Sequence, residues 1–81
     1  MKAESLHIQV TELSVTHIDL TFCASLTEHL PRLLPEKIRA RLRRRAIDPC
    51  AIASQARASG FEPGELFRMA EGPRTLRAWL E

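Results

Sequence analysis

The chain has 81 residues, of which 44% are hydrophobic and 27% are charged, and its formal net charge is +2. These values are ordinary for a globular protein, do not indicate disorder, and do not by themselves imply a nucleic-acid partner. A chain of this length forms one domain, residues 1–81, and buries only about 60–65% of its unfolded surface, which disfavours a large enclosed active-site cavity.

The first part of the chain predicts a β-hairpin. Apolar and polar residues alternate from Ser5 to Val10 and again from Thr16 to Phe22. A period of two over this length is typical of half-buried strands. The link Glu12-Leu13-Ser14 is short enough to be the loop between them.

The loop length decides the register of this hairpin. A three-residue loop places Ile8 opposite Ile18, and it also places Leu6 opposite Leu20. A two-residue loop would place Ile8 opposite His17 and mix the apolar and polar faces. We expect the three-residue loop, because the apolar face of a half-buried strand fixes its register.

After Ala24 the apolar spacing changes to three and four residues, which predicts helices. The first covers about residues 25–34, and Pro31 inside it would kink it. The second helix begins with Pro35 in its first turn. It places three apolar residues on one face: Ile38, Leu42 and Ala46.

Asp48-Pro49 is the clearest helix start in the sequence. An aspartate side chain accepts hydrogen bonds from the open N–H groups of the first turn, and proline suits the first helical position. This third helix should run to about Ser59, where Gly60 fits the left-handed residue that ends a helix. Its narrow apolar face consists of Ile52, Ala53 and Ala56.

A second hairpin is predicted from Leu66–Glu71 and Thr75–Leu80, where period two returns on both sides of the turn signal Gly72-Pro73. Loops of two and four residues share one register. That register directs two pairs toward the helices, Phe67 with Ala78 and Met69 with Leu76.

The element order ββ-ααα-ββ predicts an α+β fold. The two hairpins should join into one small antiparallel sheet, with the three short helices packed on one of its faces. The chain carries no signal-peptide pattern and no apolar run near the roughly 20 residues of a membrane helix. We therefore expect a cytoplasmic protein in which the thiols of Cys23 and Cys50 are free.

Short motifs follow one another along residues 15–81. They are Ile18-Asp19-Leu20-Thr21-Phe22, Leu33-Leu34-Pro35-Glu36, Arg41-Leu42, Ala46-Ile47-Asp48, Gly64-Glu65-Leu66 and Leu76-Arg77-Ala78-Trp79-Leu80-Glu81. This order resembles the small bacterial SHOCT-like domain proteins, in which a helix–helix unit with an Ile-Asp junction precedes an acidic-tipped hairpin. The arginine-rich second helix and the less acidic tip depart from that pattern. The resemblance implies a bacterial module of poorly defined role, with oligomerisation as one candidate, and it transfers no catalytic residue.

Six of the 12 basic side chains lie between Lys37 and Arg45, on the second predicted helix. Four of them are candidate contacts to an anion or to nucleic acid: Arg39, Arg43, Arg44 and Arg45. Cations placed in this way neutralise phosphates and release counterions. Base reading is disfavoured, because the charges wrap around the helix. The alternative is a solvated basic face in which Arg41 and Arg45 pack their stems along the core edge.

The face of the second hairpin that points away from the helices is a candidate partner interface. It would carry Trp79, Leu66, Arg68 and Arg77. A tryptophan beside a leucine resembles an interface anchor. Two arginines directly opposite each other repel, so a carboxylate supplied by a partner would help there. In the alternative, a three-residue loop pairs Phe67 with Trp79 and places Trp79 in the core.

The remaining polar residues do not form a recognisable reactive site. His7 faces Asp19 in the preferred register, with His17 diagonal to it, but an open sheet face offers no nucleophile, pocket or oxyanion stabiliser. Cys23 and His29 lack the close spacing of zinc ligands. We assign no catalytic residue, no metal and no cofactor.

These observations predict a non-enzymatic protein-interaction or self-association module, possible as a homo-oligomer. The alternative is a nucleic-acid-associated protein that binds phosphates through the Arg-rich helix 37–45. The sequence indicates no membrane partner and no small-molecule ligand.

Overall fold

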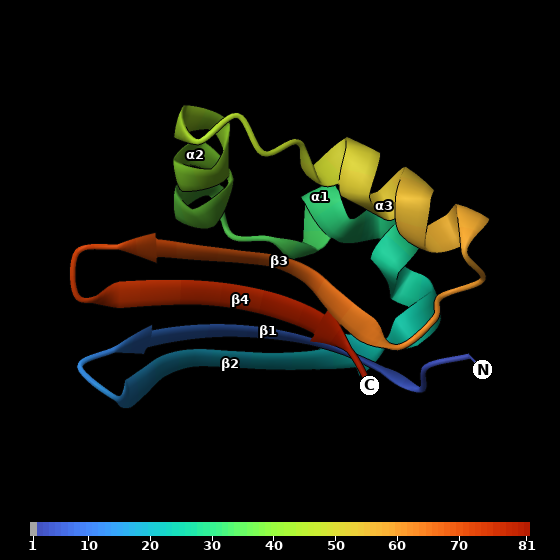
Figure 1. Cartoon of the computed structure of the whole chain (residues 1–81), viewed down its shortest axis with the longest axis horizontal. Coiled ribbons are helices and arrows are strands. Elements are labelled where there is room, and N and C mark those ends of the chain that lie inside the picture. Colours follow the sequence, from blue (N-terminus) through green and yellow to red (C-terminus); the bar gives the residue numbers. More distant parts are fainter. Residues whose placement is uncertain (1) are drawn as a thin grey trace.

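A computed structural model describes residues 2–81 (Figure 1). Two strands come first, β1 (Ser5–Glu12) and β2 (Val15–Cys23). Four helical segments follow: the 3₁₀ helix η1 (Ala24–His29), α1 (Leu30–Leu33), α2 (Glu36–Arg44) and α3 (Pro49–Ala58). The last elements are β3 (Gly64–Glu71) and β4 (Arg74–Leu80).

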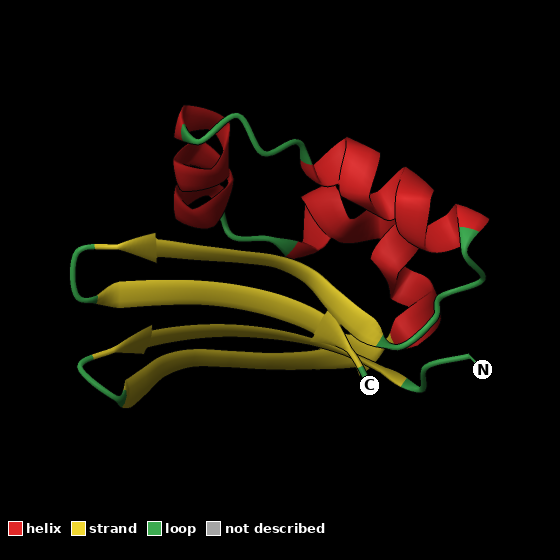
Figure 2. Ribbon diagram, viewed as in Figure 1, coloured by secondary structure: helices red, strands yellow, loops and turns green. Residues whose placement is uncertain are grey.

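The four strands form one antiparallel sheet in the order β2-β1-β4-β3. The first and last strands of the chain are therefore the two central strands. The helical segments all lie on one face of this sheet, and the other face is left uncovered (Figure 2). The predicted α+β fold of two joined hairpins with helices on one face is confirmed.

The pairing of β1 with β4 forms the centre of the core. Its three apolar pairs are Leu6 with Leu80, Ile8 with Ala78 and Val10 with Leu76, and all six side chains are buried. The helical segments cover these pairs with Leu30, Leu34, Ile38, Leu42, Ala53 and Ala56, which are also buried. The apolar residues that recur every second position on the strands and every third or fourth position on the helices thus pack into one cluster.

The predicted register of the first hairpin is wrong. Ile8 lies opposite Leu20, not Ile18, and Leu6 lies opposite Phe22. The same apolar face still points to the core, because the shift is by two residues and two is the period of a strand.

A tight turn and a bulge together produce this register. The turn contains only Leu13 and Ser14, whose φ angles of 50° and 67° are those of the turns that match strand twist. Between Val10↔Ile18 and Thr11↔Thr16 the register slips by one residue. The extra residue on β2 keeps the apolar side chains inward, as a β-bulge does.

The register of the second hairpin is confirmed where Phe67 lies opposite Ala78 and Met69 opposite Leu76. Leu66 was predicted to lie beside Trp79 on the face that points away from the helices, and this prediction is wrong. A shift between Glu65 and Phe67 places Glu65, rather than Leu66, opposite Trp79.

Proline, aspartate and glycine mark the helix ends in the structure much as the sequence predicted. The first predicted helix is divided into η1 and one turn of α1, with Pro31 in that turn. Asp48 caps α3 as expected, with its Oδ1 accepting a hydrogen bond from the Cys50 N–H at 2.9 Å. Gly60 ends α3 with a φ of 72°, as predicted.

The placement of Ala46 on the apolar face of α2 is wrong. The helix ends at Arg44, and Ala46 is exposed with a φ of 58°. Its N–H donates to the Arg43 carbonyl at 3.1 Å, while the Ile47 N–H donates to the Leu42 carbonyl at 2.9 Å. This is a Schellman ending, whose left-handed position is normally glycine.

We predict that Ala46→Gly stabilises the protein by about 0.5–1 kcal/mol. The left-handed conformation costs an L-residue roughly 1–2 kcal/mol, and the greater freedom of glycine in the unfolded chain offsets only part of that gain. Urea denaturation measures the change. Ala51→Gly, at an exposed helical position of α3, is the control and should destabilise by up to about 1 kcal/mol. A less stable Ala46→Gly variant would contradict this account.

Candidate functional site

The uncovered sheet face carries the side chains that alternate away from the core. Across its centre they form two rows that follow the strand pairing. One row contains Thr21, His7, Trp79 and Glu65; the other contains Asp19, Gln9, Arg77 and Arg68. No helix of the described residues covers this face (Figure 2).

Trp79 lies on this face and is half-buried, so it is not part of the core. The His7 ring stacks with it at a centroid distance of 5.0 Å and an interplanar angle of 15°. The Arg77 guanidinium carbon lies 4.4 Å from the Trp79 ring centroid, in a cation–π contact. The carboxylate of Glu81 accepts from Trp79 Nε1 at 3.4 Å and lies 3.3 Å from His7 Nε2.

The two arginines of the face are directly opposite each other, as predicted. The carboxylate between them comes from the same chain, since Glu65 Oε2 lies 3.3 Å from an Arg68 nitrogen and 3.5 Å from Arg77 Nε. The second contact lacks hydrogen-bond geometry, and Arg77 Nε is buried without an acceptor among residues 2–81. One carboxylate thus balances two guanidiniums.

Beside these arginines the face is hollowed. The hollow is about 490 Å³ and reaches the hairpin turns, and Arg68, Arg77, Gln9, Thr11 and Thr75 contribute to its lining. At its far end lies Leu13, which is 77% exposed in the Leu13-Ser14 turn. Among the described residues that line it there is no carboxylate, so the polar groups it presents are mainly hydrogen-bond donors.

Of the four residues predicted for the partner interface, three come together and one does not. Trp79, Arg68 and Arg77 share the uncovered face. Leu66 lies in the bulge and packs against the core cluster near Ile52 and Ala56 of α3, because the extra residue turns its side chain to the other side.

Sequence reasoning placed His7 on an open sheet face but not beside Trp79, and it did not find Glu65 or Leu13 as members of this face. Placing His7 beside Trp79 requires the pairing of β1 with β4, and placing Glu65 there requires the bulge. The sequence did indicate that Leu13 is exposed, because an apolar residue in a tight hairpin turn lies too far from the core to be buried in it.

The arginines of α2 and of its C-terminal cap divide into two groups. Two of them link this end of the helix to β3: Arg45, the cap residue, donates to the Ala70 carbonyl at 3.0 Å, and Arg44 lies 3.7 Å from Glu71. Arg39 donates to the Pro31 carbonyl at 3.4 Å. Among residues 2–81, neither Arg39 nor Arg43 has an ion-pair partner. Fewer of these cations are therefore without a protein contact than the sequence suggested, although all four stay exposed.

Charge is segregated between the two layers of the fold. The segment from Ala24 to Ala58, which forms the helical layer, contains eight basic and three acidic side chains, a net charge of +5. The rest of the chain contains four basic and seven acidic side chains, a net charge of −3. The net charge of +2 is therefore the sum of a basic helical layer and an acidic remainder of the chain, which includes the sheet.

The predicted histidine–aspartate pair does not form. His7 faces Thr21, whose Oγ1 lies 3.4 Å from Nδ1, and Asp19 faces Gln9. His17 instead lies 3.4 Å from Glu12. The two-residue shift in register separates the groups that the sequence had placed together.

Both cysteines are free and exposed. Within residues 2–81, no three His, Cys, Asp or Glu side chains gather as metal ligands would. No helix in this described part of the chain is long and apolar enough to cross a membrane.

Comparisons with protein-family models, with curated proteins and with solved structures gave no match to this chain.

Proposed function

We propose that this protein is a non-enzymatic protein-interaction module that binds its partner through the uncovered sheet face. The observation that supports this most directly is Trp79, which is half-exposed on a central strand of that face, next in the strand alternation to the Arg77 that lines the hollow. Tryptophan and arginine are the residues that most often contribute the large share of binding energy in protein interfaces.

The side chains around Trp79 already contact it in the single chain. His7, Arg77 and Glu81 contact its ring or its N–H, which lowers the side-chain entropy that is lost when a partner binds. Leu13 adds a second apolar group at the other end of the hollow. The face thus offers apolar contacts at both ends and donors between them.

The partner we favour is a second copy of the chain. The face carries both signs of charge, with Arg68 and Arg77 on one side and Asp19 on the strand farthest from them. A twofold axis through the face would bring arginines of one copy toward carboxylates of the other, as an isologous interface requires. The resemblance to SHOCT-like proteins and the cytoplasmic location stay predictions.

The oligomeric state tests this proposal. At micromolar concentration, sedimentation should show a dimer of the 9.2 kDa chain, and Trp79→Ala should shift it to the monomer by removing the central contact. Because Trp79 is the single tryptophan, its fluorescence should change over the same concentration range.

Leu26→Ala is the matched control. Leu26 is also an exposed large apolar residue, at 38%, but it belongs to η1 in the helical layer. This variant should keep the wild-type mass. A strict monomer whose Trp79→Ala variant is equally stable would contradict the proposal.

Binding of nucleic acid by the helical layer is a second candidate function. The net charge of +5 between Ala24 and Ala58 favours it, because phosphate neutralisation depends on the local density of cations. Because Arg44 and Arg45 contact β3, the exposed cations of α2 without an ion-pair partner among residues 2–81 are Lys37, Arg39 and Arg43.

This candidate predicts weak binding of duplex DNA or RNA that falls steeply with salt. Changing Lys37, Arg39 and Arg43 to Gln should lower the slope of log K against log salt by up to about 0.9 per lost phosphate contact. Fluorescence anisotropy measures it. The control changes Lys2, Arg68 and Arg74 to Gln, which removes the same charge from outside the helical layer. No binding at low salt would exclude this function.

A further inference from the structure

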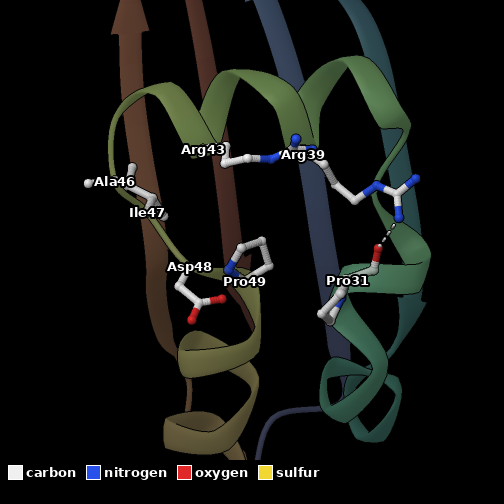
Figure 3. Close-up of a pocket in the computed structure, with 7 residues that line it drawn as sticks. All are labelled: Pro31, Arg39, Arg43, Ala46, Ile47, Asp48 and Pro49. Carbon is white, nitrogen blue, oxygen red and sulfur yellow. Dashed lines mark hydrogen bonds between the residues drawn. The ribbon is translucent and has the colours of Figure 1, made fainter.

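A second hollow lies in the helical layer, where α2 passes over the ends of α1 and α3 (Figure 3). Its volume is about 350 Å³, at the lower end of the range for small-ligand sites. Arg39 and Arg43 contribute from α2, Pro31 from α1, Ile47 from the α2–α3 connection and Pro49 from the first turn of α3.

Two prolines leave a backbone carbonyl free to accept from one cation of this hollow. In a helix the carbonyl of Pro31 would accept from the N–H of the residue four places on, but that residue is Pro35, which has no N–H. The carbonyl instead accepts from Arg39 Nη1 at 3.4 Å. This bond uses one of the five guanidinium donors and leaves the other four without a hydrogen-bond partner among residues 2–81.

Arg43 adds a second guanidinium one helical turn further along. Side chains four residues apart share a face of a helix, and both arginine side chains run along the same side of α2 above the hollow (Figure 3). Asp48 also lines the hollow, with its carboxylate accepting from the Cys50 N–H. Two cations and one carboxylate leave a net charge of +1, which suits a monoanion.

The rest of the lining is apolar. Ile47 and Pro49 are half-buried, and the methyl group of Ala46 lies at the same wall. The left-handed conformation of Ala46 turns the chain so that these residues follow directly after the arginines of α2. An apolar surface therefore lies within a few residues of the two guanidiniums.

We propose that this hollow binds an amphipathic monocarboxylate. The forks of Arg39 and Arg43 hold the carboxylate, since guanidiniums bind carboxylates through paired hydrogen bonds. The apolar body of the ligand lies on Ile47 and Pro49. This site is separate from the sheet face, so it neither requires nor excludes the proposed protein interaction.

Octanoate is the probe. Titrated into the full chain and followed by amide chemical shifts, it should give saturable changes at Ala46, Ile47 and Arg43. Butanoate should bind more weakly, because a shorter chain buries fewer methylenes. Octanamide, which keeps the chain and lacks the charge, should bind at least about tenfold more weakly than octanoate.

The variant that tests the site changes Arg39 and Arg43 to Gln, and it should weaken octanoate binding at least about tenfold. Changing Lys37 and Arg57 to Gln removes the same charge from exposed positions outside the lining, and this control should bind octanoate as the wild type does. Circular dichroism confirms that both variants are folded.

Three results would overturn the proposal: equal binding by the arginine variant, equal binding of octanamide, or shift changes spread through the sheet core instead of the hollow. Trp79→Ala should leave octanoate binding unchanged. Failure of this site and failure of the sheet-face proposal are therefore separate outcomes.

Discussion

The pairing of β1 with β4 is the contact on which the rest of the structure depends. It joins two hairpins that are each too small to be stable in water, since two-stranded hairpins are marginal and need a wider sheet or a covering helix. It also aligns Leu6, Ile8 and Val10 with Leu80, Ala78 and Leu76, the buried centre of the core. The helices have an apolar surface to cover only after this alignment exists.

The same pairing creates the other face of the sheet. Because β strands alternate, each buried pair is followed by an outward pair, and His7 opposite Trp79 is the outward neighbour of Leu6 with Leu80. The stack, the cation–π contact of Arg77 and the hydrogen bond to Glu81 all depend on this position. One strand register, that of β1 with β4, therefore determines both the core pairs and the pairs of the candidate interface.

The sequence predicted the parts of the fold that are encoded locally. The strand and helix periods, the Asp48 cap and Gly60 are short-range signals, and each reflects the hydrogen-bonding or steric need of a single turn. The joining of the two hairpins into one sheet was also expected, since paired edges are the usual solution for short strands.

What the sequence did not predict are the irregular positions. The bulges at β2 and at Leu66 add a residue without a compositional mark, and each alters which side chains meet. Ala46 occupies the left-handed position at the end of α2, where a glycine would have allowed the helix end to be predicted. For the candidate site the consequence was larger: Arg68, Arg77 and Trp79 were identified, whereas the contacts of Trp79 with His7 and Glu81 required long-range pairing.

The central position of β4 has a consequence for synthesis of the chain. During translation the first hairpin, the helices and β3 all leave the ribosome before β4, the strand that lies between β1 and β3. Until Leu80 has emerged, β1 and β3 each present an unpaired side and the apolar faces of the helices lack their sheet. Folding of this protein is therefore expected to be a late, concerted event in which non-local contacts form together rather than in order of synthesis.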